Sequence, residues 1–219
     1  FQILVFAPST VQEMVDLVSD AFDAADKYRM PAMILADGML GQMMEPVELP
    51  EKTDRVLAEK PWAASGHKNK RRHNIVNSLY LTPNALEDLV RERYARYEKI
   101  QETEQRAEEY LTEDAEIVLV AYGASARVAR SAVNKAREQG LKVGLVRPIT
   151  LWPFPVNALK RTAETAKQLL VVEMSMGQMV DDVKLAVECQ VPVHFYGRTG
   201  GMIPTPAAVL AQIERLLEK

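Results

Sequence analysis

The chain has 219 residues, of which 47% are hydrophobic and 26% charged, and its formal net charge is −3. This composition is typical of a globular protein with a substantial core, and the balanced charge gives no electrostatic reason to expect nucleic acid as a partner. The single cysteine, Cys189, excludes an intrachain disulfide and an iron–sulfur cluster, which needs about four ligands. With no apolar run of membrane-spanning length and no targeting signal, we expect a cytoplasmic protein without a membrane anchor. Because Phe1 already lies within an ordered pattern, we expect the chain to be a piece of a longer one.

Residues 1–50 carry a net charge of −6 and follow a strand–helix–strand pattern. A short apolar run at residues 3–6 predicts the first strand. Thr10-Val11-Gln12-Glu13 then fits a capping box, and apolar residues recur every three or four positions to Ala25, which predicts a helix. Residues 30–36 predict a buried strand. This βαβ unit indicates a parallel sheet larger than 50 residues can supply.

Residues 51–113 read as a connector. The segment 45–80 is irregular, and its basic run at residues 65–73 is best explained as a solvated linker, with a phosphate-gripping loop as the alternative. Thr82-Pro83 marks a helix start. Apolar residues at spacings of three and four predict a long helix to about Leu111. Its narrow apolar stripe favours a strut packed on one side over a partner-binding coil.

Residues 114–219 alternate strictly between strands and helices. Strands are predicted at 116–122, 142–146, 168–172 and 192–196, and a helix is predicted after each strand. Gly140 is expected to end the first of these helices. Strict alternation specifies an open, doubly wound parallel sheet. The sequence therefore divides into 1–50, 51–113 and 114–219, and its fold class is α/β.

Candidate contact residues come from the loops at the carboxyl ends of the last group of strands, where such sheets bind ligands or partners. They are Arg147, Glu173, Gln178, Arg198 and Thr199, taken as anion or interface contacts. For Arg147 and Arg198 a structural ion pair is an equally good reading. Glu173 at a strand end is either an acid–base group or a residue with a capping or interface role.

Catalytic signatures are incomplete. Gly123-Ala124-Ser125 begins like a nucleophile elbow, but Arg127 stands where a second glycine is needed, so we read Ser125 as a helix cap. The chain has no dinucleotide-binding glycine motif and no phosphate loop. Its three histidines are not spaced as metal ligands, and His194 reads as a core or interface residue. The residues thus predict a binding edge with no catalytic residues and no metal site.

Three motifs together resemble a known family. The run Arg147-Pro148-Ile149-Thr150-Leu151-Trp152-Pro153-Phe154-Pro155 is similar to the signature loop of transketolase C-terminal-type domains. With residues 172–179 and 195–201, the chain resembles the alpha subunit of 2-oxoacid:ferredoxin oxidoreductases, closest to the 2-oxoisovalerate (branched-chain) type. Residues 31–37, 45–47 and 78–80 are also similar to that subunit. The resemblance covers the whole chain and the C-terminal two-thirds of the family subunit.

The resemblance implies three parts: the tail of a thiamine pyrimidine-binding domain (1–50), a connector with a long helix (51–113) and a transketolase C-terminal-like domain (114–219). The family uses thiamine diphosphate for coenzyme A-dependent oxidative decarboxylation of a 2-oxoacid, and electrons leave through iron–sulfur clusters to ferredoxin. The diphosphate and Mg²⁺ contacts belong to the beta subunit, and the clusters belong to other polypeptides. No family catalytic residue can be carried onto a position of this chain.

We therefore expect a subunit piece that is inactive alone and binds no cofactor by itself. Its expected partners are a thiamine-binding beta subunit and an iron–sulfur subunit, with ferredoxin reached indirectly, in an oligomeric complex. Two alternatives remain open. One is the equivalent piece of another thiamine enzyme, such as a transketolase or an oxoacid dehydrogenase beta chain. The other is a module that binds a small anion at the loop edge.

Overall fold

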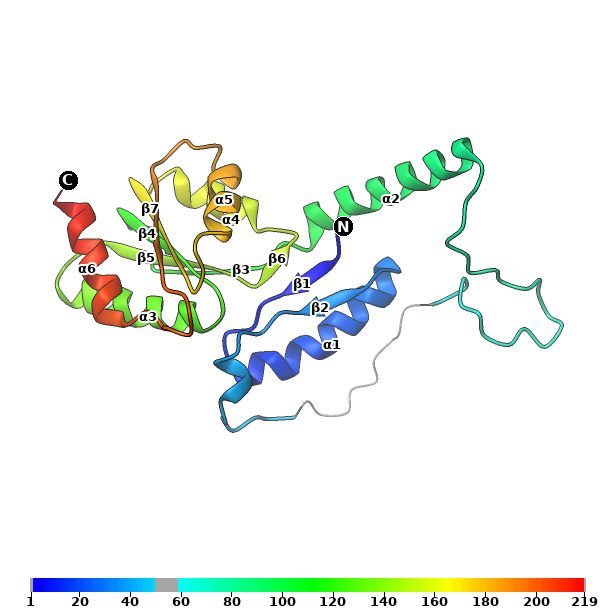
Figure 1. Ribbon diagram of the computed structural model, residues 1–219, viewed down its shortest axis with the longest axis horizontal. Helices are drawn as coiled ribbons and strands as arrows, with labels where there is room; N and C mark the ends of the chain where they lie inside the picture. The colour runs from blue at the N-terminus through cyan, green and yellow to red at the C-terminus, as the bar shows by residue number, and fades with distance from the viewer. Residues whose placement is uncertain (1, 50–58, 219) are drawn as a thin grey trace.

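The computed structural model describes residues 2–49 and 59–218, in two α/β units joined by a long helix (Figure 1). The N-terminal part holds β1 (Leu4–Phe6), α1 (Val11–Tyr28), β2 (Ala32–Ile34) and a short 3₁₀ turn, η1 (Leu40–Gln42). The long helix is α2 (Pro83–Thr103). The remaining elements are β3 (Ala107–Tyr110), β4 (Ile117–Val120), α3 (Gly123–Glu138), β5 (Val143–Pro148), β6 (Thr150–Trp152), α4 (Val156–Ala163), β7 (Gln168–Glu173), α5 (Met179–Ala186), β8 (Val193–Gly197) and α6 (Pro206–Leu217).

The N-terminal unit is a small sheet with α1 packed on one face. Its strand order is β2-β1-β6, with β2 parallel and β6 antiparallel to β1. The Thr10 half of the capping box is confirmed, because the Thr10 hydroxyl accepts the Glu13 N–H at 3.0 Å. The Glu13 carboxylate accepts the N–H of Ser9 at 2.7 Å in place of that of the N-cap Thr10. The strand predicted at 30–36 forms over fewer residues. It is not buried as predicted, since Met33 is 43% exposed on the face that α1 leaves uncovered.

The long helix ends at Thr103, so the prediction that it continues to about Leu111 is wrong. The backbone carbonyl of Arg106 accepts the N–H groups of Ile149 and Thr150, at 2.9 and 3.1 Å. This pairing starts β3, which runs antiparallel to β5. The helical spacing of apolar residues fades over this stretch, and a free sheet edge offers its backbone a complete set of hydrogen-bond partners.

The C-terminal unit is the predicted doubly wound sheet with one addition. Its strand order is β3-β5-β4-β7-β8; β4, β5, β7 and β8 are parallel, and β3 is an antiparallel edge strand that the sequence did not predict. Alternate residues of β4 face opposite layers: Ile117 and Leu119 pack against α3 and α6, whereas Val118 and Val120 pack against α4 and α5. Figure 1 shows the two helix pairs on either side of the sheet.

One short segment links the two sheets. The chain leaves β5 at Pro148 and two residues later enters β6, which belongs to the sheet of the N-terminal unit. Thr150 and Trp152 pair there with Phe6 and Val5. The two units therefore share a continuous strand connection that neither periodicity nor composition indicated.

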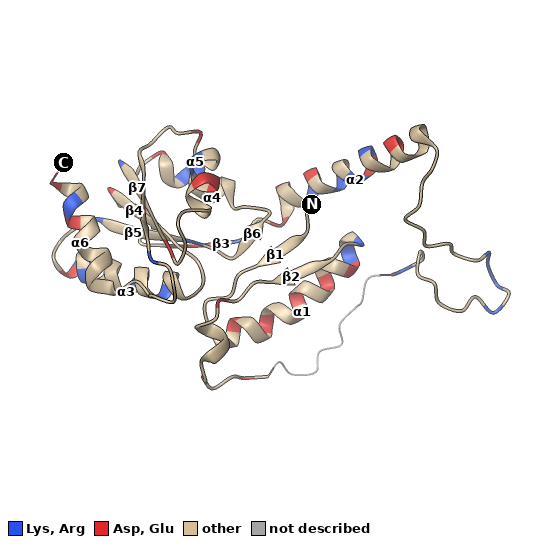
Figure 2. Cartoon of the chain, viewed as in Figure 1, with Lys and Arg blue, Asp and Glu red and all other residues tan. Residues whose placement is uncertain are grey.

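Charge is distributed unevenly over this framework. In Figure 2 the positions of acidic residues recur along α1, and those of basic residues lie in the irregular segment that precedes α2. Among the described residues, no helix combines the length and apolar character needed to cross a membrane.

Candidate functional site at the domain junction

Arg147 lies in β5, and its side chain enters the junction between the two units. Its guanidinium makes two hydrogen bonds to the Glu13 carboxylate at 2.9 and 3.0 Å, and its Nε donates to Glu108 at 2.7 Å. The Arg147 side chain is only 8% exposed. A bidentate contact of this kind is strong and geometrically specific. These contacts are those of a structural ion pair, which was one of the roles predicted for Arg147.

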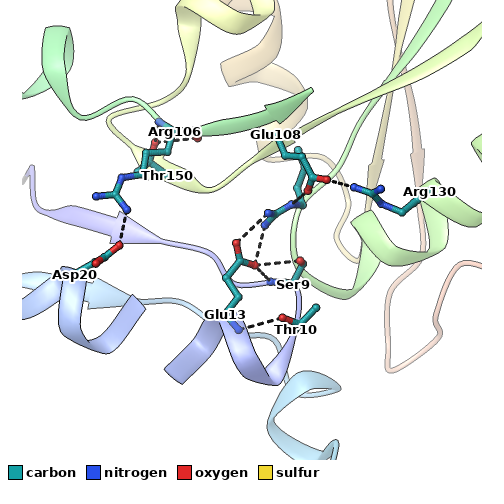
Figure 3. A network of polar contacts seen from close by, with 9 residues as sticks. Ser9, Thr10, Glu13, Asp20, Arg106, Glu108, Arg130 and Thr150 are labelled. Carbon is teal, nitrogen blue, oxygen red and sulfur yellow. Dashed lines mark hydrogen bonds and ion pairs between the residues drawn. The ribbon is translucent and has the colours of Figure 1, made fainter. Parts of the chain in front are cut away.

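The junction network extends to both sides of Arg147 (Figure 3). Glu108 of β3 also pairs with Arg130 of α3. Glu13 keeps its capping contacts to Ser9, so a single carboxylate both caps α1 and binds the neighbouring domain. Burial raises the pKa of Glu108, but the hydrogen bond to Arg147 and the charges of Arg147 and Arg130 outweigh it. The net result is a pKa below the ordinary value of a glutamate.

A cleft of about 620 Å³ opens beside this network. It contains three arginine and three acidic side chains, so it has no excess of positive charge. Its third arginine, Arg127, pairs with Glu45 at 2.7 Å. The lining residues are Ser9, Thr10, Gln12, Glu13, Asp16, Glu108, Ala126, Arg127, Arg130, Ser131 and Arg147. None of them is a histidine or a cysteine. The Ser9 hydroxyl donates to the Glu13 carboxylate at 3.1 Å, but that carboxylate is also held by Arg147.

Glu173 lies at the loop edge as predicted and caps α5. Its buried carboxylate accepts the N–H groups of Gln178, Met179 and Val180 at 3.0–3.1 Å and the Ser175 hydroxyl at 2.8 Å. These donors occupy both carboxylate oxygens. The capping alternative for Glu173 therefore matches its contacts, and the carboxylate is not presented to a substrate.

The other loop-edge candidates remain open to contact. The side chains of Gln178 and Thr199 are exposed, and Arg198 is half-buried. The Arg198 N–H donates to the Glu173 carbonyl at 3.1 Å, which fixes its backbone. Its guanidinium has no hydrogen-bond or ion-pair partner among residues 2–49 and 59–218. The structure thus brings Glu173, Gln178, Arg198 and Thr199 to one edge, whereas Arg147 lies at the domain junction.

Asp37 caps α3 from the other unit, which sequence reasoning missed. Its carboxylate accepts the Ala124 N–H at 2.7 Å and the Leu40 N–H at 2.9 Å. Gly123 makes room for it, because a Cβ at that position, where φ is +59°, would lie 2.5 Å from Asp37 Oδ2. Ser125 is the third residue of α3, so its predicted role as the cap is wrong. The only sequence signal was an Asp-Gly pair directly after a strand.

At the three helix starts nearest the junction and loop edge, carboxylates of the chain accept helix N–H groups: Glu45 at α1, Asp37 at α3 and Glu173 at α5. Tyr122 lies near two of these groups, and burial, Glu173 and Asp37 together raise its pKa. A helix N-terminus binds an external phosphate through free N–H groups. Such a ligand would have to displace a built-in carboxylate here.

The remaining residues considered for chemistry are His194, Cys189 and any group that could hold a metal ion. The half-buried His194 is hydrogen-bonded to Gln168 at 3.0 Å, and Cys189 is exposed and unpaired. No cluster of three or more His, Cys, Asp or Glu in the described part of the chain is placed to hold a metal ion. Taken with the carboxylate-filled helix starts, these residues do not by themselves form a diphosphate–Mg²⁺ site.

Two family profiles meet at the start of the C-terminal unit. "Pyruvate flavodoxin/ferredoxin oxidoreductase, thiamine diP-bdg" matches residues 1–116, and "Pyruvate:ferredoxin oxidoreductase core domain II" matches residues 115–209. The first is a thiamine diphosphate-binding domain, which defines the class of protein. The chain belongs to the 2-oxoacid:ferredoxin oxidoreductase family, and the resemblance inferred from its motifs is confirmed.

Its relatives within the family differ in substrate. The chain is 46% identical over 213 residues to ketoisovalerate oxidoreductase subunit VorB of Methanothermobacter marburgensis, covering 97% of the chain and 60% of that protein. It is 31% identical over 230 residues to 2-oxoglutarate synthase subunit KorA of Methanocaldococcus jannaschii, covering 94% of the chain and 62% of that protein. The chain thus spans about 60% of the length of these relatives.

Solved structures confirm the fold. A 2-oxoglutarate:ferredoxin oxidoreductase from Magnetococcus marinus, with 2-oxoglutarate, coenzyme A and succinyl-CoA bound, aligns with a TM-score of 0.73 at 19% identity. The alignment covers 97% of this chain and 42% of that one. A split gene transketolase, an inactive beta4 tetramer, aligns with a TM-score of 0.56 at 15% identity over 99% of this chain and 58% of that one. At these identities the likeness concerns fold alone, so the transketolase match does not favour transketolase activity.

Proposed function

We propose that the chain is part of a thiamine-diphosphate-dependent 2-oxoacid:ferredoxin oxidoreductase that acts on 2-oxoisovalerate. The complex converts the 2-oxoacid and coenzyme A to acyl-CoA and CO₂ and passes two electrons to ferredoxin. The substrate class is supported by 46% identity to a ketoisovalerate oxidoreductase subunit, against 31% to a 2-oxoglutarate synthase subunit. Coenzyme A as acceptor is supported by its presence in the Magnetococcus marinus structure.

Within the complex, the role assigned to this chain is structural. Residues 1–50 are the tail of the thiamine pyrimidine-binding domain, 51–113 the connector and 114–219 the transketolase C-terminal-like domain. The observation that carries this role is the junction, where Arg147 joins Glu13 of the first part to Glu108 of the sheet edge. This network of ion pairs fixes the orientation of the two units.

The remaining components belong to other subunits. Mg²⁺ and the diphosphate contacts are assigned to a beta subunit, and the iron–sulfur clusters to a cysteine-rich subunit that reduces ferredoxin. The lone exposed Cys189 supports this division, because a cluster needs about four ligands. The complex is placed in the cytoplasm, consistent with a chain that uses one cysteine. Arg198 and Thr199 are the candidate anion or subunit contacts, since both remain available at the loop edge.

A reconstitution experiment tests the proposal. The chain alone, supplied with thiamine diphosphate, Mg²⁺, coenzyme A, 2-oxoisovalerate and an oxidised viologen, is expected to show no decarboxylation. Affinity capture of the tagged chain from its source should recover a thiamine-binding subunit and an iron–sulfur subunit. Turnover by the chain alone would contradict the structural role. Capture of a lipoyl-bearing acyltransferase would instead identify a piece of an oxoacid dehydrogenase.

Substrate choice is tested on the captured complex. Viologen reduction is compared for 2-oxoisovalerate, pyruvate and 2-oxoglutarate at matched concentrations. The proposal expects the highest kcat/KM with 2-oxoisovalerate. A preference for either other acid would contradict this assignment while leaving the family unchanged.

A further inference from the structure

Residues 63–74, here called the basic loop, fold back on themselves in the segment that precedes α2 (Figure 1). The side-chain amide of Asn74 donates to the Ala63 carbonyl at 3.0 Å, which holds the two ends of the loop together. The Arg71 guanidinium donates to the Ser65 carbonyl, also at 3.0 Å. A compact loop of about 6–16 residues that is closed by its own side chains is an Ω-loop, and such loops are frequently functional. This closed conformation favours a binding role for the basic run over that of an extended linker.

The neck of the basic loop is fixed to the N-terminal unit. Just before the loop, Lys60 forms an ion pair with Asp26 of α1 at 2.5 Å. The Arg29 guanidinium lies over the Trp62 ring, 4.6 Å from its centroid. A loop that is already held at its neck loses less conformational freedom when a ligand binds to its tip. The loop is therefore partly preorganised for binding.

The tip of the basic loop carries positive charge that the chain itself does not neutralise. Residues 65–73 contain four lysine and arginine residues, two histidines and no acidic residue. Lys68, Lys70 and Arg72 are exposed, and their side chains make no hydrogen bond or ion pair with residues 2–49 and 59–218. In Figure 2 the positions of basic residues lie on this loop without an acidic one between them. Three unpaired cations within five residues raise the local potential and attract an anion with several charges.

Two imidazole rings lie beside these cations. His67 and His73 pack edge to face, with ring centroids 4.2 Å apart. The Nδ1 atom of His67 accepts the Asn69 N–H at 3.0 Å, so a neutral His67 ring carries its proton on Nε2 as a donor. Nucleobases stack on aromatic side chains, histidine included, and nearby cations bind the phosphates that the base carries. Rings and cations together therefore favour a nucleotide over an acidic peptide, which needs the cations alone.

The spacing of the cations limits the size of the anion. Lys68 and Arg72 are four residues apart in the sequence, so their Cα atoms lie at most about 14 Å apart. A single nucleotide with phosphates at two positions can reach all three cations over this distance. Of the reactants in the proposed function, coenzyme A alone has an adenine base together with phosphates at two positions of one ribose.

We propose that the basic loop binds the nucleotide end of coenzyme A. Lys68, Lys70 and Arg72 contact its 3′-phosphate and 5′-diphosphate, and the histidine pair lies beside the adenine. This inference rests on the proposed function, because that function supplies coenzyme A as the acceptor. The thiol of coenzyme A lies at the opposite end of a long flexible chain, so a projecting loop can hold the nucleotide away from the reacting group. The basic loop acts in binding and takes no part in the chemical step.

Steady-state kinetics of the captured complex test this site. One variant combines Lys68→Gln, Lys70→Gln and Arg72→Gln, which removes three charges without breaking a contact between described residues. Each exposed charge pair contributes roughly two- to threefold in affinity, so the KM for coenzyme A should rise about tenfold. The kcat and the KM for 2-oxoisovalerate should not change. A matched control, which should leave every KM unchanged, removes three exposed charges outside the loop: Lys99→Gln, Lys135→Gln and Arg215→Gln.

Ligands that differ in their phosphate groups identify the part of coenzyme A that is bound. Dephospho-coenzyme A lacks the 3′-phosphate, so the wild-type complex should have a higher KM for it than for coenzyme A. The triple variant of the basic loop should lose most of this preference. Calorimetry of the complex with adenosine 3′,5′-bisphosphate measures binding without turnover, and the Kd should rise about tenfold in the variant. Inorganic phosphate at the same concentration should not displace this nucleotide, and equal displacement would overturn the assignment to coenzyme A.

The kinetic results also separate this site from other roles of the loop. An unchanged KM for coenzyme A in the triple variant would overturn the proposal, because the cations would then be only solvated. A rise confined to the KM for ferredoxin would also overturn it and would assign the loop to an acidic protein surface. A wild-type complex that turns over no 2-oxoacid with coenzyme A would instead contradict the proposed function. Calorimetry would still decide in that case whether the basic loop binds the nucleotide.

Discussion

Replacing Arg147 tests whether the junction network holds the two units together. Arg147 is 8% exposed, but its partners Glu13 and Glu108 are 22% and 36% exposed. Breaking a fully buried pair costs about 3–5 kcal/mol and an exposed pair about 0–1 kcal/mol. Water can reach both stranded glutamates here, so Arg147→Ala should lower the free energy of unfolding by about 2–3 kcal/mol. Arg147→Lys keeps the charge but loses the bidentate geometry, and should cost about 1 kcal/mol.

Urea unfolding followed by Trp152 fluorescence measures this loss. Trp152 lies in β6, which joins the two sheets, so its signal reports the junction; Trp62→Phe in every variant removes the second tryptophan. With a urea slope of about 2–3 kcal/mol per molar, the midpoint of Arg147→Ala should fall by about 1 M. The matched control is Arg161→Ala, whose pair with Glu109 is 60% and 33% exposed. It should cost at most about 0.5 kcal/mol.

Two results would refute the reasoning. The first is a midpoint for Arg147→Ala no lower than that of Arg161→Ala, which would mean that the network contributes nothing beyond an ordinary surface pair. The second is a loss of stability for Arg147→Lys as large as that for Arg147→Ala. That result would mean that the positive charge at this position contributes nothing to the free energy of unfolding. A double-mutant cycle with Glu13→Gln then isolates the coupling between these two residues, because Glu13 also caps α1.

Three further changes test the remaining carboxylates. Glu173→Gln replaces a charged acceptor with one amide oxygen, so it should lower stability by about 1–3 kcal/mol and speed amide exchange at Met179 and Val180. Asp37→Ala removes the cap of α3 and should cost about 1 kcal/mol, with faster exchange at Ala124. The pKa of Glu108 is lower in the folded protein than in the unfolded chain, so its stabilisation is complete above the unfolded pKa and disappears as pH falls through the folded pKa. Glu108→Gln should therefore flatten the acid side of the stability–pH curve.

Each of these changes has its own control. Glu173→Asp shortens the side chain but keeps the charge, and it should lose less stability than Glu173→Gln. Asp37→Asn keeps one acceptor oxygen, and it should lose less stability than Asp37→Ala. Exchange rates that rise equally throughout α5 and α6 would show global loss of stability instead of a lost cap. An unchanged acid limb in Glu108→Gln would mean that other carboxylates carry the pH dependence.

Local sequence signals predicted the elements well where short-range chemistry decides them. The predicted cap of α1 by the Thr10 hydroxyl forms because its partner, the Glu13 N–H, lies within one helical turn. The parallel strands β4, β5 and β7 follow from apolar runs buried on both faces, and β8 is a partly buried edge strand. The position of Glu173 at the loop edge follows from its place at the carboxyl end of a strand, and capping is one of the roles that the sequence predicts for it.

Contacts between residues far apart in the chain explain where the structure differs from the sequence predictions. Residues 107–110 were expected to continue the long helix, yet the open edge of β5 draws them into β3. Ser125 was expected to cap α3, but Asp37, 87 residues away from Ala124, takes that position. Arg147 was grouped with the loop-edge residues, and only the packing of α1 against the sheet directs it to Glu13. No local pattern contains these partners.

The sequence by itself determined the α/β class, the alternation of the C-terminal unit and, through its motifs, the family. These properties depend on side-chain period, on caps and on short contiguous motifs, all of which are encoded within a few residues. Only the tertiary structure decided how the two units are joined, which carboxylates bind the helix starts and where the Arg147 side chain lies. Those features depend on groups far apart in the chain, whose meeting is fixed by the free energy of the whole fold.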